Sequence, residues 1–144
     1  MREDGSETVA GLRKAMHAVM ESGAGIYRSQ ASLQETCGTL ADLRRRYERL
    51  ALHDRSNVFN TDLISVLELG AMLQVAEAIA HCALGRKESR GSHQRLDHPE
   101  RDDVNYLKHS LATYRGAEPP SVGYSDVVIT RSKPAARVYG GAAA

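Results

Sequence analysis

The sequence predicts a mainly α fold, an antiparallel three-helix bundle similar to a spectrin repeat, followed by a charged loop and a small β-hairpin. Three segments, about 6–22, 30–52 and 60–88, repeat apolar residues at the three- and four-residue spacing of helices. Residues 89–103 are strongly charged, and β-branched residues then gather within 104–131, as is typical of strands. We expect the 144 residues to form a single domain with a loose tail at 132–144.

The first helix is expected to begin near Ser6, whose hydroxyl can cap free backbone N–H groups, with Glu7 in the first turn. Gly23 and Gly25 are expected to end it, because glycine readily adopts the left-handed conformation found after helices. The apolar stripe of this helix is Val9, Leu12, Met16 and Val19.

The second helix is expected to begin at Ser29 or Ser32, and Ser32 with Glu35 matches a capping box. The arginine run 44–46 is interleaved with acidic residues, which favours a solvated helix face over a nucleic-acid patch. The apolar stripe is Leu33, Cys37, Leu40, Leu43, Tyr47 and Leu50, at a spacing near that of coiled coils.

The third helix is expected to start around 60–62 and is apolar around most of its circumference from Leu63 to Leu84. Such a helix is normally buried on all sides, and two neighbouring helices cannot cover it completely. It is therefore either the centre of a small bundle or a helix that further protein covers, and we favour the second interpretation. Glu77 and His81, one turn apart, are expected to form a structural hydrogen bond rather than an acid–base pair.

After this helix, ten of the eighteen residues from Arg86 to Asp103 are charged, and Gly91 and Pro99 exclude one continuous helix. Strands are expected at Tyr106–Tyr114 and Tyr124–Thr130, joined by a loop at 116–123.

Composition and motifs point away from an independent active site. A net charge of +1 gives no field that would attract nucleic acid, so we expect no nucleic-acid partner. No apolar run approaches about 18 residues, so we expect no direct membrane span. Without a secretory signal in the sequence, Cys37 and Cys82 are expected to be reduced.

Two motifs that resemble ligand sites have simpler explanations. The segment 23–25, Gly-Ala-Gly, lacks a preceding strand and a third glycine, so it is expected to end a helix rather than bind a dinucleotide. His93, Asp97, His98 and Asp102 match no metal-ligand spacing and are expected to be surface residues. We predict no catalytic residue, no metal and no cofactor on this chain.

The chain resembles one family over nearly its whole length. The carrying segments are RSNVFNTDL (55–63), LELGAMLQVAEAIAHCALGRKESRG (67–91), HQRLD, PERDD and NYLKH, together with GIYRS (25–29) and SDVVIT…ARVYGG. The most specific pattern is ESRG-x-H followed by RDD-x-N-x-LKH. These segments resemble the C-terminal helical domain of the fumarate reductase and succinate dehydrogenase flavoprotein subunit. The SDVVIT and RVYGG ending favours the fumarate reductase type, although the short HPE (98–100) departs from some of its members.

The resemblance implies a longer parent subunit in which FAD, the catalytic arginine and the substrate-binding residues all lie upstream. It also implies that the parent interconverts fumarate and succinate in a quinone-coupled complex. The partners would be the flavin domain of the same subunit and an iron–sulfur subunit, at the cytoplasmic face of the cell membrane. We expect an excised domain or a truncated reading frame.

Two functions remain open at this stage. The first is a structural and interaction domain of this subunit, and the alternative is a freestanding helical adaptor or assembly protein without catalytic activity. In the first, the charged segment would be an interface whose arginine and aspartate groups pair across the contact. The predicted interface residues are Glu88, Ser89, Arg90, Gly91, His93, Arg95, Asp97, Arg101, Asp102 and Asp103.

Overall fold

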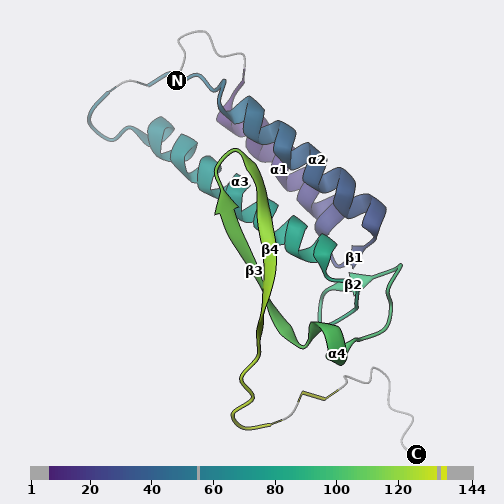
Figure 1. The fold of residues 1–144 in the computed structure, drawn as a ribbon. Coiled ribbons are helices and arrows are strands. Elements are labelled where there is room, and N and C mark those ends of the chain that lie inside the picture. The colour runs from purple at the N-terminus through teal and green to yellow at the C-terminus, as the bar shows by residue number, and fades with distance from the viewer. Residues whose placement is uncertain (1–6, 55, 133, 136–144) are drawn as a thin grey trace, which may run out of the picture.

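The computed structural model describes residues 7–54, 56–132 and 134–135. Three long helices, α1 (Val9–Ala24), α2 (Gln30–Tyr47) and α3 (Thr61–Gly85), pack against one another pairwise, and Figure 1 shows them side by side. A short helix, α4 (Asp103–Tyr106), leads into an antiparallel hairpin of β3 (Lys108–Arg115) and β4 (Glu118–Asp126) that lies across α3. A second small sheet pairs β1 (Tyr27–Arg28) in parallel with β2 (Gln94–Arg95). The prediction of a mainly helical fold with a small antiparallel sheet is confirmed.

One apolar core lies among the three long helices, and it contains most of the predicted stripe residues. The stripes on α1 and α2 are buried as expected, apart from Val9, Val19 and Tyr47, which are half-buried at its margin. Cys37 lies in this core as a free thiol, and Cys82 is also free. The fully buried members are Leu12, Leu40, Leu43, Leu50, Val66, Leu69, Leu73 and Ala80.

The first helix begins later than predicted, at residue 9 rather than 6. Ser6, the expected cap, lies outside the described residues. Thr8 takes that role, because its side-chain oxygen accepts a hydrogen bond from the Gly11 N–H at 3.1 Å. Glu7 precedes the cap and binds Arg46 of α2 with a bidentate ion pair, at 2.7 and 3.0 Å.

The first helix ends at residue 24, but not by the predicted glycine conformation. Gly25 follows it with φ −63°, so a left-handed residue is not what ends α1. Gly23 lies inside the helix, and a Cβ there would lie 2.0 Å from Thr36 Oγ1. The need for close contact between α1 and α2 therefore explains a glycine at position 23.

The second helix has its capping box one turn earlier than predicted. Ser29 and Ser32 exchange hydrogen bonds at 3.0 and 3.1 Å, so Ser32 with Glu35 is not the box. The helix ends at residue 47 rather than 52. Leu50 turns inward there, with its N–H bonded to the Tyr47 carbonyl at 3.2 Å, and becomes part of the core.

The third helix begins within the predicted 60–62, and Asn60 is its cap, because the Asn60 side chain accepts a hydrogen bond from the Leu63 N–H at 2.8 Å. It ends at residue 85 rather than 88, because Arg86 is extended (φ −88°, ψ 105°) and directs the chain into the charged segment. By length and composition this helix could cross a bilayer, because an 18-residue stretch of it has a mean hydropathy of 1.7. Of that stretch, 33% is buried in this fold. The expectation of no membrane span rested only on uninterrupted apolar runs, and Glu68 and Glu77 interrupt the apolar run of this helix. Its contacts with α1, α2 and the hairpin fit the central helix of this fold.

The hairpin is shifted relative to the prediction, with strands at 108–115 and 118–126. Residues 127–130, expected in the second strand, lie outside it, whereas the predicted loop residues Pro119 and Pro120 lie in β4. Proline is tolerated because each strand of a two-stranded sheet has a free edge. Gly116, with φ 67°, permits a tight turn where a long loop was expected. The predicted tail lies largely outside the described residues.

Candidate interaction site

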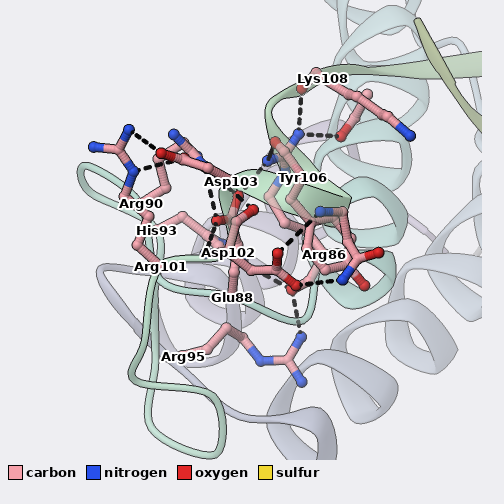
Figure 2. Close-up of polar contacts among 12 residues, drawn as sticks. Arg86, Glu88, Arg90, His93, Arg95, Arg101, Asp102, Asp103, Tyr106 and Lys108 are labelled. Atoms are coloured by element: carbon pink, nitrogen blue, oxygen red, sulfur yellow. Dashed lines mark hydrogen bonds and ion pairs between the residues drawn. The ribbon is translucent and has the colours of Figure 1, made fainter. Parts of the chain in front are cut away.

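Glu88 is the centre of the charged segment that follows α3. Its side chain is fully buried and accepts hydrogen bonds from Arg86, from Arg90 at 2.9 and 3.0 Å, and from the Asp102 N–H at 2.8 Å. Burial alone would raise the pKa of Glu88, but these hydrogen bonds outweigh it and the pKa lies below its ordinary value. Figure 2 shows Glu88 among these groups. The carboxylate is thus charged and satisfied within the chain.

Asp103 forms the outer part of the same network. Arg101 binds Asp103 with two hydrogen bonds of 2.7 Å. Arg90, which also binds Glu88, donates a further hydrogen bond to Asp103. Asp102 caps α4 by accepting from the N–H groups of Val104 and Asn105. The short helix is therefore held to the end of α3 by ion pairs of this one chain.

Arg95 and Asp97 connect the ends of two helices. Arg95 is 1% exposed, and its Nη1 donates to the carbonyls of Ala83, Leu84 and Arg86 at the end of α3, within 3.0–3.3 Å. A cation there is favoured by the helix dipole. Arg95 also binds Asp97 through two hydrogen bonds of 2.8 Å.

Asp97 extends this connection to the start of α2. Its Oδ2 accepts the Gln30 N–H at 2.9 Å, at the positive end of that helix. The hydrogen bonds from Arg95 hold the pKa of Asp97 well below its ordinary range. One ion pair thus caps the end of α3 and the beginning of α2.

His93 fastens the charged segment to the α1–α2 connection. Its Nδ1 lies 2.8 Å from Arg28 Nη1, and its Nε2 lies 3.2 Å from the Arg86 carbonyl. Since a guanidinium only donates, Nδ1 accepts and Nε2 carries the proton. Burial, with nearby arginines, lowers the pKa of His93, so the imidazole is neutral near pH 7.

The predicted interface residues therefore do come together, but their charges are paired inside the chain. Ser89 accepts the Arg95 N–H at 2.8 Å and donates to the His98 carbonyl at 2.9 Å. Gly91 occupies a turn with φ 60°. Their role as an interface stays a prediction, whereas their role in joining α2, α3 and α4 is observed. The parallel pairing of β1 with β2, which brings Tyr27 and Arg28 to this segment, had no signal in the sequence.

The arginine run on α2 is also paired with acids. Arg45 contacts Asp42 at 3.0 Å, and Arg44 donates to Glu77 at 2.7 Å and to the Gly116 carbonyl at 2.6 Å. Glu77 is buried, with 4% exposed. Its described hydrogen-bond partner is Arg44 rather than the predicted His81. Arg44 thereby ties the hairpin turn to the helices.

The outer face of α3 presents the opposite chemistry. Large apolar side chains there remain exposed: Leu63, Ile64, Leu67, Val75 and Ile79, at 36–59%. Within the described residues, α1 and α2 carry no large apolar side chain with comparable exposure. We call these five residues the apolar face of α3.

The residues weighed as ligands are engaged in other contacts. His93, Asp97 and Asp102 have the partners given above, and no group of three His, Cys, Asp or Glu residues in the described part of the chain is placed to hold a metal ion. Gly23 lies inside α1 and packs against Thr36 of α2, so this glycine belongs to a helix contact rather than to a dinucleotide loop.

Comparison with known proteins gives a consistent family. Residues 13–139 match the family described as fumarate reductase flavoprotein C-term. The chain is 53% identical over 139 residues to the fumarate reductase flavoprotein subunit of Haemophilus influenzae, covering 96% of this chain and 23% of the relative. The corresponding Escherichia coli subunit is 52% identical over 146 residues, covering 99% and 24%. A succinate dehydrogenase flavoprotein subunit of Rickettsia felis is 36% identical over 143 residues, covering 94% and 24%. The chain thus spans about a quarter of these relatives.

Solved structures share the fold. The flavoprotein FrdA of Escherichia coli quinol fumarate reductase superimposes with a TM-score of 0.90 at 51% identity, covering 99% of this chain and 25% of that one. Adenylylsulfate reductase of Archaeoglobus fulgidus, at 22% identity, has a TM-score of 0.76 and covers 86% and 20%. The first likeness, with the identities above, favours the fumarate reductase type, and the second concerns the fold alone.

Proposed function

The chain belongs to the fumarate reductase flavoprotein C-terminal family, and on that premise we propose that it acts as a structural and interaction domain of a subunit interconverting fumarate and succinate. The observation that carries the proposal is the family match from residue 13 to 139. It is combined with a charged segment whose charges pair within the chain and with the exposed apolar face of α3. The freestanding adaptor, the alternative function, has no specific observation in its favour.

In this proposal the chain contributes shape and contacts rather than chemistry. FAD, which supplies the electron transfer in such a subunit, would be held by the part of the subunit that this chain does not span. Residues 1–144 would act as one domain whose long helices form an antiparallel, spectrin-repeat-like bundle. The charged segment would keep α2, α3 and α4 rigid and would also contribute to the contact with the flavin domain.

The proposal extends to the assembly. The domain would place the flavin part beside an iron–sulfur subunit in a quinone-coupled complex, at the cytoplasmic face of the membrane, without a membrane span of its own. Neither nucleic acid nor a metal is expected on this chain.

A chimera tests the proposed function. This chain replaces the matching segment of the Escherichia coli fumarate reductase flavoprotein subunit, of which it covers 24%. We expect the chimera to bind flavin and reduce fumarate, and a subunit lacking the segment to lose both. A folded chimera without flavin and turnover would contradict the proposal. The 144-residue chain alone should be colourless and inactive, and stoichiometric flavin in that preparation would also count against it.

A further inference from the structure

Methionine side chains line a groove between α1 and α3. The groove has a volume of about 380 Å³, and all its lining residues are apolar: Met16, Met20, Ala71, Met72, Val75, Ala76 and Ile79. Three of the four methionines in the sequence lie here. Methionine is flexible and polarisable and is common on surfaces that adapt to a partner.

A ridge of side chains runs along α3 beside this groove. Leu67, Ala71, Val75 and Ile79 follow one another at four-residue spacing, and all four are exposed. Rows with this spacing are the ridges that pack into the grooves of another helix. Arg13 and Glu68, 3.6 Å apart, mark the polar end of the surface, one turn before Met16 and Met72 respectively.

We propose that this surface, the methionine groove with its ridge, is the docking site for an apolar helix from the part of the flavoprotein subunit that this chain does not span. The inference rests on the proposed function and names the contact surface within it. The occupant carries bulky aliphatic or aromatic side chains and no charge toward the groove, because a charge buried against an all-apolar lining would be strongly unfavourable.

One observation favours this occupant, and a second favours this surface over the charged segment. The chain covers only 23–25% of its fumarate reductase relatives, so the larger part of such a subunit is available to cover a face. The charged segment leaves the same helix with its ion pairs already satisfied, so it offers less reason for docking than the exposed ridge does. A second copy and a bilayer are outcomes that the experiment separates.

The test uses the chimera described above with Val75→Lys, which places a charge on the ridge. Val75 is 58% exposed, so the free chain should keep its helical circular dichroism and its urea midpoint. In the chimera we expect the flavin-loaded fraction to fall at least about tenfold, or about 1.4 kcal/mol. Val75→Leu should retain flavin. Gln34→Lys, on the exposed side of α2, adds the same charge away from the surface and should also retain it.

The outcomes are distinct for the two proposals. If the unsubstituted chimera fails, the proposed function fails. If it succeeds and Val75→Lys retains flavin, the docking surface is wrong while the proposed function stands. Equal losses from Val75→Lys and Gln34→Lys would also overturn the surface. The docking surface would also be wrong if Val75→Lys abolished dimerisation of the free chain, or its sedimentation with phosphatidylcholine vesicles, and left the chimera unaffected.

Discussion

The charged segment after α3 and the apolar face of α3 are neighbours along the chain, but their side chains differ in exposure in opposite ways. In the segment, Glu88 and Arg95 are charged yet at most 1% exposed, because each finds several partners within the chain. On the face, Leu67 and Val75 are apolar yet 59% and 58% exposed, because no described element covers them. A partner is therefore better indicated by what a fold leaves unsatisfied than by how unusual a segment is in composition.

This difference changes what a substitution in the charged segment would report. If Arg90 paired only with a neighbouring domain, the free chain would tolerate its loss. Its contacts with the buried Glu88 and with Asp103 mean that the free chain itself should suffer. Loss of stability in a parent subunit would then not demonstrate an interface.

The largest expected effect is that of Arg90→Glu on the free chain. The substitution removes a partner of Glu88 and adds a second carboxylate beside it, so unfolding free energy should fall by about 3–5 kcal/mol in urea titrations. Arg45→Glu is the control, because Arg45 pairs with the exposed Asp42, and it should cost less than about 1 kcal/mol. Equal small losses for both variants would mean that the segment is merely solvated.

A smaller effect is expected from Asp97→Asn, which tests the connection between α2 and α3. The amide removes the charge that Arg95 and the Gln30 N–H both contact, and should cost about 1–3 kcal/mol of unfolding free energy. Asp42→Asn, at an exposed pair, should cost less than about 1 kcal/mol. If calorimetry gave Asp97→Asn the melting temperature of the unsubstituted chain, Asp97 would not support the helix ends.

Acid should weaken the charged segment gradually. In the folded chain the pKa values of Glu88, Asp97 and Asp103 lie below the ordinary 4.5 and 3.8. Because the folded-state pKa is depressed, the stabilisation is complete above those ordinary values and is lost as pH falls through the folded-state pKa values. The contribution of these carboxylates should be constant above about pH 5 and decline below it, whereas His93, whose folded-state pKa is lowered from 6.5, should add a decline that begins as pH falls through about 6.5. A decline that began above about pH 7 would implicate other groups.

The smallest effect on stability belongs to the apolar face of α3. Val75→Lys should change the unfolding free energy of the free chain by no more than about 0.5 kcal/mol, because the side chain is already exposed. The unsubstituted chain should bind a hydrophobic dye or self-associate, and the variant should do so less. A dye-silent, monomeric chain at high concentration would remove the reason to expect a partner there.

Local pattern was sufficient for the helices and for much of the core. The stripes at Leu12–Met16 and Leu33–Leu43 point inward because helical period alone places them on one side. The start of the third helix was also predicted within 60–62, since an N-cap depends on a side chain and the few N–H groups that follow it. The apolar excess of α3 was visible from composition, and the family from its segments.

Boundaries and pairings were decided by distant residues. The sequence could not indicate that Gly23 serves contact with Thr36, that Arg44 reaches Glu77 and the hairpin turn, or that Pro119 and Pro120 lie in a strand. It was sufficient for helical periodicity and for the presence of a charged segment, because these depend on neighbours within a few residues. Which charges meet, and which apolar face stays open, was decided only in the tertiary structure, since pairing energies depend on distances between groups far apart in the chain.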